Sequence, residues 1–168
     1  MKTISKADFL SILQTLRKHK VDFIIVGGVC AVLHGAPIST FDLDLVHSRD
    51  PENVERLMAA LKSLKAYFRE QGIRRSKPVR SHLSSPGHQL LMTQYGPLDL
   101  LGAIGKNLDR GYAELLNATS ELNLPNGLKV RVLTLEKLIE MKAEFARDKD
   151  KAVLGLLRRT LEEVRRRR

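Results

Sequence analysis

Two aspartates, Asp42 and Asp44, lie one residue apart in the otherwise apolar stretch FDLDLV. Buried strands rarely hold carboxylates, because removing a charge from water is costly unless a partner or a metal ion compensates. Alternate residues of a strand face the same side, so we expect both carboxylates to project together while Phe41, Leu43 and Leu45 pack on the other side. Neighbouring carboxylates raise each other's pKa unless a cation lies between them, and their oxygens suit Mg²⁺ or Mn²⁺.

A third carboxylate, Asp99, follows in the apolar segment GPLDLLG. If this segment is a strand beside FDLDLV, the three aspartates converge. Such a set is typical of two-metal phosphoryl transfer: Asp42 and Asp44 would bridge the metal ions, and Asp99 would bind the second metal and help to deprotonate an attacking hydroxyl. The alternative is that the aspartates lie on an exposed edge strand or pair with nearby Arg or Lys. We favour the catalytic interpretation, because the pair and the later aspartate both follow a glycine turn.

That turn is formed by Gly27 and Gly28, which end the apolar segment VDFIIVGG. Glycine lets the backbone approach a ligand without interference from a β-carbon. The helix expected after the turn would offer free N–H groups to an anion. A Gly-Gly pair is weak evidence by itself, but the next strand supplies the carboxylates. We therefore predict a phosphate-binding turn next to a metal site.

The elements that would position these residues form an α/β (or α+β) pattern, which predicts a mixed β-sheet flanked by helices. Helices are expected over residues 6–19, capped by Ser5, 29–35 and 49–64, capped by Asp50. Strands are expected over residues 22–26, 41–48, 88–95 and 97–102, with a hairpin over 119–133 that turns at Asn126 and Gly127. The basic segment 69–86 is expected to be a loop, and residues 134–164 to be helical with a break near Arg147.

The composition narrows the class of partner. The chain has 168 residues and a formal net charge of +10, which favours partners that carry phosphate. The terminal run Arg165–Arg168 is either a solvated tail, which we favour, or a docking surface for a polyanion such as tRNA.

No apolar segment has the length of a membrane span, so we expect a cytoplasmic protein with no membrane partner. The single cysteine, Cys30, is expected to be a small buried residue.

In order and spacing, the glycine turn, FDLDLV and the later LDLL resemble the nucleotidyltransferase superfamily (the DNA polymerase beta-like fold) from Asp22 to about Gly102. Within it, the chain is similar to small stand-alone bacterial and archaeal proteins, some of which are toxins of toxin–antitoxin pairs. We expect a nucleotidyltransferase core with an N-terminal helix over residues 1–133. A C-terminal helical segment over residues 134–168 would pack on or beside it.

The resemblance implies a Mg²⁺-dependent enzyme that moves a nucleoside monophosphate from an NTP such as ATP to a hydroxyl or phosphate of an acceptor. RNA, tRNA, a protein or a small aminoglycoside-like molecule could be that acceptor, and an antitoxin could be a partner. By the motif match, Gly27 and Gly28 would hold the triphosphate, Asp42 and Asp44 would bind Mg²⁺ (or Mn²⁺), and Asp99 would be the third carboxylate.

The chain departs from the family pattern in the loop before FDLDLV. Ile38 stands where many relatives carry an arginine, so Ser39 and Thr40 would partly replace it as hydroxyl donors to the nucleotide. Gly28 stands where many relatives carry a serine. Lys142 either binds nucleotide phosphate or lies on a solvated helix face with ion pairs. These departures support an alternative function, a catalytically weak nucleotidyltransferase-fold protein that binds RNA or a partner protein.

Overall fold

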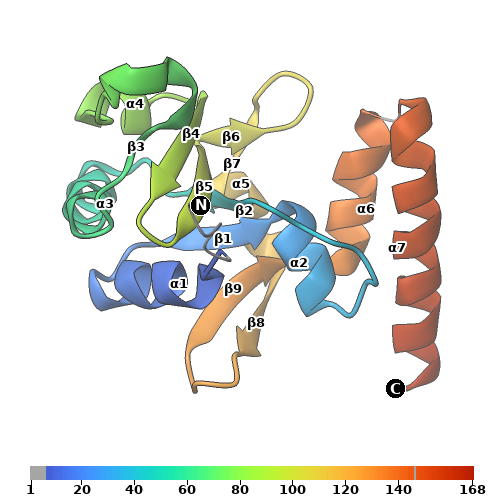
Figure 1. Cartoon of the computed structure of the whole chain (residues 1–168). Coiled ribbons are helices and arrows are strands. Elements are labelled where there is room, and N and C mark those ends of the chain that lie inside the picture. Colours follow the sequence, from blue (N-terminus) through green and yellow to red (C-terminus); the bar gives the residue numbers. More distant parts are fainter. Residues whose placement is uncertain (1–6, 146) are drawn as a thin grey trace, which may run out of the picture.

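The computed structural model describes residues 7–145 and 147–168 (Figure 1). Its α-helices are α1 (Phe9–Lys18), α2 (Gly27–Leu33), α3 (Pro51–Ser63), α4 (Arg80–Ser84), α5 (Tyr112–Leu115), α6 (Leu135–Glu144) and α7 (Asp148–Arg166). Two 3₁₀ helices are η1 (Arg69–Arg74) and η2 (Leu116–Ala118). The strands are β1 (Phe23–Val26), β2 (Leu43–His47), β3 (Tyr67–Phe68), β4 (His88–Thr93), β5 (Gly96–Leu101), β6 (Ala103–Ile104), β7 (Arg110–Gly111), β8 (Thr119–Asn123) and β9 (Lys129–Leu133).

Seven strands form one mixed sheet in the order β3-β4-β5-β2-β1-β9-β8, and β6 pairs with β7 separately. The pairs β2–β5 and β1–β9 are parallel, and the other pairs in the large sheet are antiparallel. The predicted mixed sheet flanked by helices is therefore confirmed. Strands β2 and β5 are neighbours although about fifty residues of sequence separate them, so the topology brings FDLDLV and PLDLL together.

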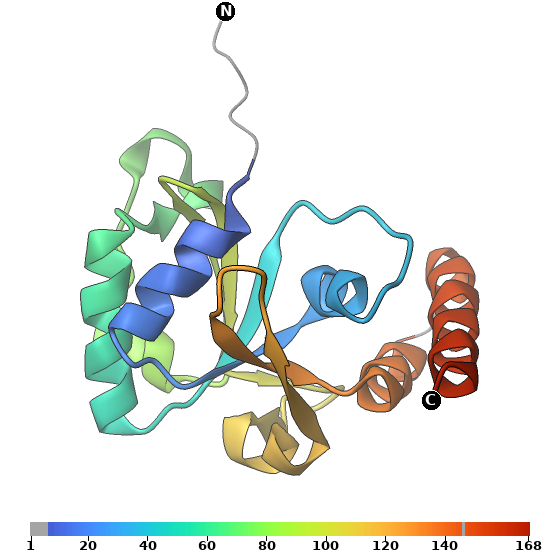
Figure 2. The same cartoon turned by 90° about the horizontal axis from the view of Figure 1, so that it is seen from below.

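Helices cover both faces of this sheet. Figure 2 shows α1 and α3 together on one side, and α2, α6 and α7 on the other. The core between these layers is built from aliphatic side chains such as Leu16, Ile25, Leu45, Leu57 and Leu100, all fully buried. Consecutive apolar residues in β1 are buried on both faces, which is typical of a central strand covered on both sides.

Short polar side chains fix where several helices begin. Asp8 caps α1, accepting a hydrogen bond from the Ser11 amide at 3.0 Å, whereas the predicted cap Ser5 lies outside the described residues. Helix α3 begins at Pro51 after Asp50, as predicted, although Asp50 makes no capping hydrogen bond through its side chain. Thr134 caps α6 in the same way as Asp8 caps α1.

The segment 69–86 is not the continuous loop that was predicted. It contains η1 and α4, and the two-residue strand β3 just before it pairs Phe68 with Leu91 of β4. These elements are too short to produce an apolar periodicity, and Leu83 is the fully buried residue by which α4 contacts the core. The predicted break of the C-terminal helical region near Arg147 is confirmed, since α6 ends at Glu144 and α7 begins at Asp148.

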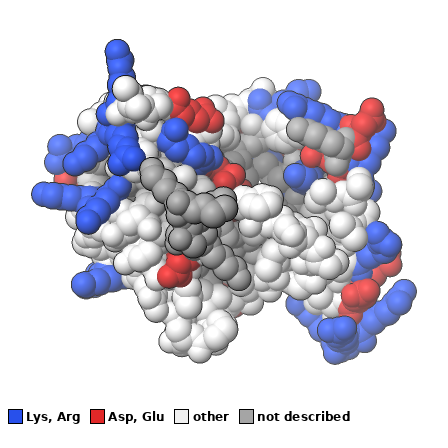
Figure 3. All heavy atoms as spheres, in the orientation of Figure 1, with Lys and Arg blue, Asp and Glu red and all other residues white. Residues whose placement is uncertain are grey.

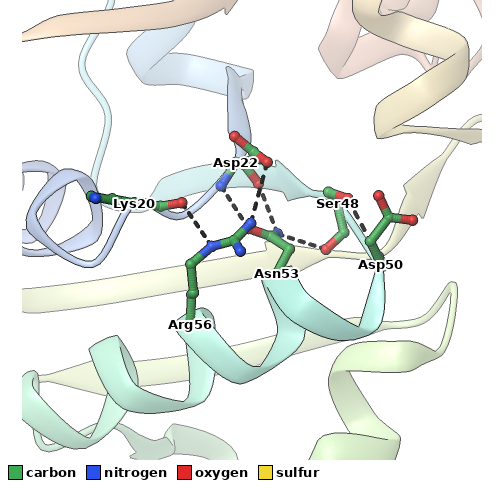
Figure 4. A network of polar contacts seen from close by, with 6 residues as sticks. All are labelled: Lys20, Asp22, Ser48, Asp50, Asn53 and Arg56. Carbon is green, nitrogen blue, oxygen red and sulfur yellow. Dashed lines mark hydrogen bonds and ion pairs between the residues drawn. The ribbon is translucent and has the colours of Figure 1, made fainter.

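A polar network fixes the ends of β1 and β2 that lie near α3 (Figure 4). The Asn53 amide is 1% exposed, accepts from the Asp22 amide at 2.7 Å and donates to the backbone oxygens of Asp22 and Ser48. Arg56 donates to the Lys20 carbonyl at 3.0 Å, and its guanidinium lies 3.5 Å from the Asp22 carboxylate. Every hydrogen-bonding group of the Asn53 amide thus faces a partner.

The single cysteine belongs to the packed interior. Burial raises the pKa of the Cys30 thiol to about 12, and its Sγ faces the Leu133 carbonyl, so this cysteine is a packed core residue as predicted.

Figure 3 shows basic side chains gathered over the α3 and α4 side of the molecule and at the end of α7 that carries the C-terminus. Among the described helices, none has the length and apolar character needed to cross a membrane.

Candidate active site

The sheet register brings two of the predicted carboxylates side by side. Asp44 of β2 is the direct partner of Asp99 of β5, and Asp42 lies two residues before Asp44, just ahead of the strand. One expectation of the alternation was wrong, because the Phe41 side chain is 80% exposed rather than packed. The reason is that β2 begins at Leu43, so the pleat of the strand does not extend to Phe41.

The glycine turn lies directly against these carboxylates. Gly27 has a φ of +68°, and a β-carbon added to it would lie 2.2 Å from the Asp44 Oδ2 atom. A β-carbon on Gly28 would lie 2.6 Å from the Thr40 Oγ1 atom. A larger residue at Gly27 would therefore strain the backbone and displace the Asp44 carboxylate, and one at Gly28 would displace the Thr40 side chain. This close approach places the turn where the sequence predicted it, beside the aspartates.

An arginine that the sequence did not single out completes the cluster. Arg69 begins η1 just after β3, and its Nη1 donates to Asp99 Oδ1 at 2.6 Å and to the Leu91 carbonyl at 2.9 Å. Its Nη2 lies 3.9 Å from Asp42 Oδ2. The Asp99 side chain is 11% exposed and that of Arg69 21%, so water screens this pair only weakly. We call Asp42, Asp44, Asp99 and Arg69 the carboxylate cluster.

The electrostatics of the cluster show an excess of negative charge. Burial raises the pKa of Asp44 most, and the charge of Asp99, its hydrogen bond to Asp44 and the charge of Asp42 act in the same direction, so that together they bring it to about 7. The charge of Arg69 acts in the opposite direction on Asp44. Burial would lower the pKa of Arg69, but its hydrogen bond and ion pair with Asp99 raise it overall. One arginine thus compensates only part of the charge of three aspartates.

The donor set fits a hard divalent cation, because carboxylate oxygens on neighbouring strands are the ligands that Mg²⁺ and Mn²⁺ prefer. Within residues 7–145 and 147–168, however, no three His, Cys, Asp or Glu side chains are already arranged around one point suitable for a metal ion. The guanidinium of Arg69 is instead the cation in contact with Asp99. The chemistry therefore fits a metal, provided that the carboxylates rearrange around it.

The loop before β2 holds the other residues predicted to contact nucleotide. Thr40 lies against Gly28, and its hydroxyl donates to the Asp42 carbonyl at 3.1 Å, so it belongs to the site's immediate surroundings. Ser39 is exposed one residue earlier. Ile38 packs against the hydrophobic core, which explains why an apolar residue is tolerated there.

Lys142 lies on α6, away from these contacts. Its Nζ is 3.7 Å from Asp150 Oδ1 of α7, and its side chain is 40% exposed. The structure thus shows the ion pair of a helix surface, and the predicted contact of Lys142 with nucleotide stays a prediction. His34, beside the glycine turn in sequence, is hydrogen-bonded through Nε2 to the Leu133 carbonyl at 2.8 Å, as expected for a packing residue.

Comparison with known proteins supports this architecture. No family model and no curated protein matches the sequence. Among solved structures, a proposed nucleotidyltransferase from Thermotoga maritima is 18% identical, with a TM-score of 0.56 over 92% of this chain and 91% of the other. The lincosamide antibiotic adenylyltransferase LnuA with lincomycin bound is 16% identical, with a TM-score of 0.61 over 89% of this chain and 94% of the other.

A third structure, ANT(2″)-Ia in complex with adenylyl-2″-tobramycin, is 19% identical, with a TM-score of 0.57 over 91% of this chain and 87% of the other. The similarity to all three spans nearly the whole of each chain. Together with the mixed sheet and the strand order, it shows that this chain has the nucleotidyltransferase fold.

Proposed function

We propose that the protein is a Mg²⁺-dependent nucleotidyltransferase that moves a nucleoside monophosphate from an NTP to an acceptor hydroxyl. The observation that carries this proposal is the pairing of Asp44 with Asp99 across β2 and β5, directly against Gly27. Neighbouring carboxylates that repel one another beside a turn with no side chains suit a metal–triphosphate complex, because a bound cation would relieve the repulsion. Acid-rich sites without such a ligand are costly to maintain, because the charges repel each other.

In this mechanism, Asp42 and Asp44 would hold the metal ions, and Asp99 would bind the second ion and accept the proton of the attacking hydroxyl. Bound metal would lower the charge on the phosphates and orient them for in-line attack. The acceptor oxygen forms a bond with the α-phosphorus, and the bond from that phosphorus to the bridging oxygen breaks, so pyrophosphate leaves. Gly27, Gly28, Ser39 and Thr40 would line the nucleotide side of the site, with Lys142 as a further phosphate contact.

The charge distribution favours an acceptor that carries phosphate, such as RNA or tRNA. A cavity of about 710 Å³ between α3 and residues 75–78 has a mainly apolar wall, and Lys62, Lys65, Arg75 and Lys77 line it together with the acidic Glu55. Tyr67 also lines it, two residues before Arg69 of the carboxylate cluster. A hydroxylated small molecule is the competing acceptor, because lincomycin and adenylyl-tobramycin are bound in two proteins of the same fold. For an RNA or protein acceptor, we propose a toxin role with an antitoxin partner.

Calorimetry with each NTP in the presence of Mg²⁺ or Mn²⁺ tests the central proposal. We expect metal-dependent NTP binding by the wild type and none by the Asp42→Ala, Asp44→Ala double variant. Asp148→Ala is the matched control, since Asp148 is 98% exposed on α7 and pairs, among the residues that the structure describes, with its helix neighbour Lys151. Absence of metal-dependent NTP binding by the wild type would contradict the proposal.

A second candidate is a catalytically weak protein that uses the same fold to bind RNA or a protein. Ile38 favours it, because no charged side chain stands at that loop position to neutralise developing phosphate charge. Incubation with labelled NTPs and either cellular RNA, cellular protein or aminoglycosides separates the two. Transfer of label that is lost in Asp99→Asn excludes the weak-binder alternative and identifies the acceptor class.

A further inference from the structure

We propose that Arg69 is the built-in counter-ion of the carboxylate cluster, and that a divalent cation must displace its guanidinium from Asp99 in order to bind. This inference rests on the proposed function, because it assigns a role to Arg69 in the same metal site. It makes Arg69 a positioning residue of that site: it holds the carboxylates in place when no metal is bound and weakens metal binding in return.

The contacts of Arg69 are those of a residue directed at the site rather than at solvent. One nitrogen, Nη1, is bound both to Asp99 Oδ1 at 2.6 Å and to the Leu91 carbonyl at 2.9 Å. The second terminal nitrogen lies 3.9 Å from Asp42 Oδ2. Because Asp99 is only 11% exposed, this interaction differs from a surface ion pair, which water and salt would weaken to near zero.

A guanidinium and a metal ion would compete for Asp99, whose Oδ1 atom already accepts a hydrogen bond from Arg69. Mg²⁺ binds carboxylate oxygen at about 2.1 Å and requires near-octahedral geometry, so it needs Asp99 with its lone pairs free. Metal binding to Asp99 and the hydrogen bond from Arg69 are therefore expected to exclude each other.

The segment that carries Arg69 can release it without disturbing the core. Residues 70–77 are exposed, and the 3₁₀ helix is kinked at Gly72, where φ is +60° and ψ is −131°. Its far end is held to β3 by the hydrogen bond from the Phe68 amide to the Ser76 carbonyl and by Arg75, whose guanidinium lies 5.0 Å from the centre of the Tyr67 ring. The tether lies at β3, so the Arg69 side chain can turn away while the segment stays attached.

The test is a titration with Mn²⁺ alone, followed by electron paramagnetic resonance of the free ion, on the full chain. We expect Arg69→Gln to bind Mn²⁺ about tenfold more tightly than the wild type, since the competing cation is gone. Arg74→Gln is the matched control: it removes the same charge from an exposed position of the same segment, and its affinity should stay within about twofold of the wild type.

The outcomes separate this inference from the proposed function. Equal or weaker Mn²⁺ binding by Arg69→Gln, with wild-type binding by Arg74→Gln, overturns the role of Arg69 and leaves the metal site standing. Absence of Mn²⁺ binding in all three proteins overturns both. Arg69→Lys guards against a misfolded Gln variant: lysine keeps the charge but lacks the second nitrogen of the fork, so an affinity between those of the wild type and the Gln variant is expected.

Discussion

The molecule holds two polar clusters at opposite ends of β1 and β2, and they differ in how well their charges are matched. At the end near α3, the Asn53 network pairs one carboxylate, Asp22, with one guanidinium, and every group of the buried amide has a partner (Figure 4). At the other end, three aspartates share a single arginine, and the pKa of Asp44 is raised to about 7.

We interpret this difference as one between a structural cluster and the proposed functional one. A buried network in which every hydrogen-bonding group has a partner stabilises the fold and needs no ligand. A cluster with surplus charge is maintained at a cost to stability, which is typical of sites that bind an ion or a charged substrate. The contrast predicts opposite effects of mutation: the carboxylate cluster should affect chemistry more than stability, and the Asn53 network the reverse.

The largest expected effect is on catalysis. Asp99→Asn should lower the rate of nucleotide transfer at least about 100-fold, because it removes a metal ligand and the proposed proton acceptor. Its free energy of unfolding should change by less than about 1 kcal/mol, since loss of the Arg69 ion pair is offset by relief of the repulsion with Asp44. Pyrophosphate release and urea unfolding measure the two effects, with Asp148→Asn as control. A large loss of stability in Asp99→Asn would contradict the distinction.

At the opposite end, Asn53→Ala should lower the free energy of unfolding by about 3 kcal/mol. The substitution leaves the amide and carbonyl of Asp22 and the Ser48 carbonyl without their buried partners. Below the unfolding transition, the activity per folded molecule should equal that of the wild type. Lys62→Ala on the exposed face of the same helix should cost less than about 0.5 kcal/mol. Equal losses in both variants would mean that the network does not stabilise the fold.

Much of the carboxylate cluster could be predicted from the sequence, and one central part could not. Asp42, Asp44 and Asp99 stand out because a carboxylate between aliphatic residues is rare, and the period of a strand fixes which side chains face together. Arg69 carries no such signal. It is one of several basic residues in a segment without periodicity, and only the two-residue strand β3 before it directs the side chain to Asp99.

The two wrong predictions, for Phe41 and for residues 69–86, both concern places where short elements begin or end. The prediction that Phe41 is packed assumed that the strand alternation begins before Asp42, but β2 begins at Leu43. Elements of two to five residues, such as β3 and α4, depend on tertiary contacts rather than on local propensity. Long periodic elements, such as α3 and the two C-terminal helices, were predictable because their apolar stripe repeats several times.

A pH series sharpens the comparison further. The raised pKa of Asp44 means that the folded state binds a proton more tightly than the unfolded state, whose pKa is near the ordinary value of 3.8. Stability should therefore fall as the pH rises from about 4 to 7 and then level off. The stability of Asp44→Asn should lack this dependence on pH. Its free energy of unfolding should therefore match that of the wild type near pH 4 and exceed it by roughly 1–3 kcal/mol at pH 8. Burial also lowers the pKa of His47, which destabilises the fold in acid. The wild type and Asp44→Asn share this effect, so the difference between their free energies of unfolding reports on Asp44 alone.

The smallest expected effect comes from the glycine turn, where two positions separate backbone strain from displacement of a carboxylate. Gly27 and Gly127 have φ values of +68° and +80°, so alanine at either position should cost about 1 kcal/mol of stability. At Gly127 the space around a new β-carbon is empty, whereas at Gly27 it would collide with Asp44 Oδ2. The carboxylate is the end of a side chain and can turn away, so the collision adds little to the loss of stability.

The consequence for metal binding is different, because the displaced oxygen is one that the metal needs. Gly27→Ala should weaken Mn²⁺ binding about fivefold while Gly127→Ala leaves it unchanged, although thermal unfolding finds the two variants similarly destabilised. If both variants bound Mn²⁺ as the wild type does, the close contact between the turn and Asp44 would be a matter of packing alone. The turn would then resemble the Asn53 network rather than the carboxylate cluster, and glycine at position 27 would serve only the backbone conformation between β1 and α2.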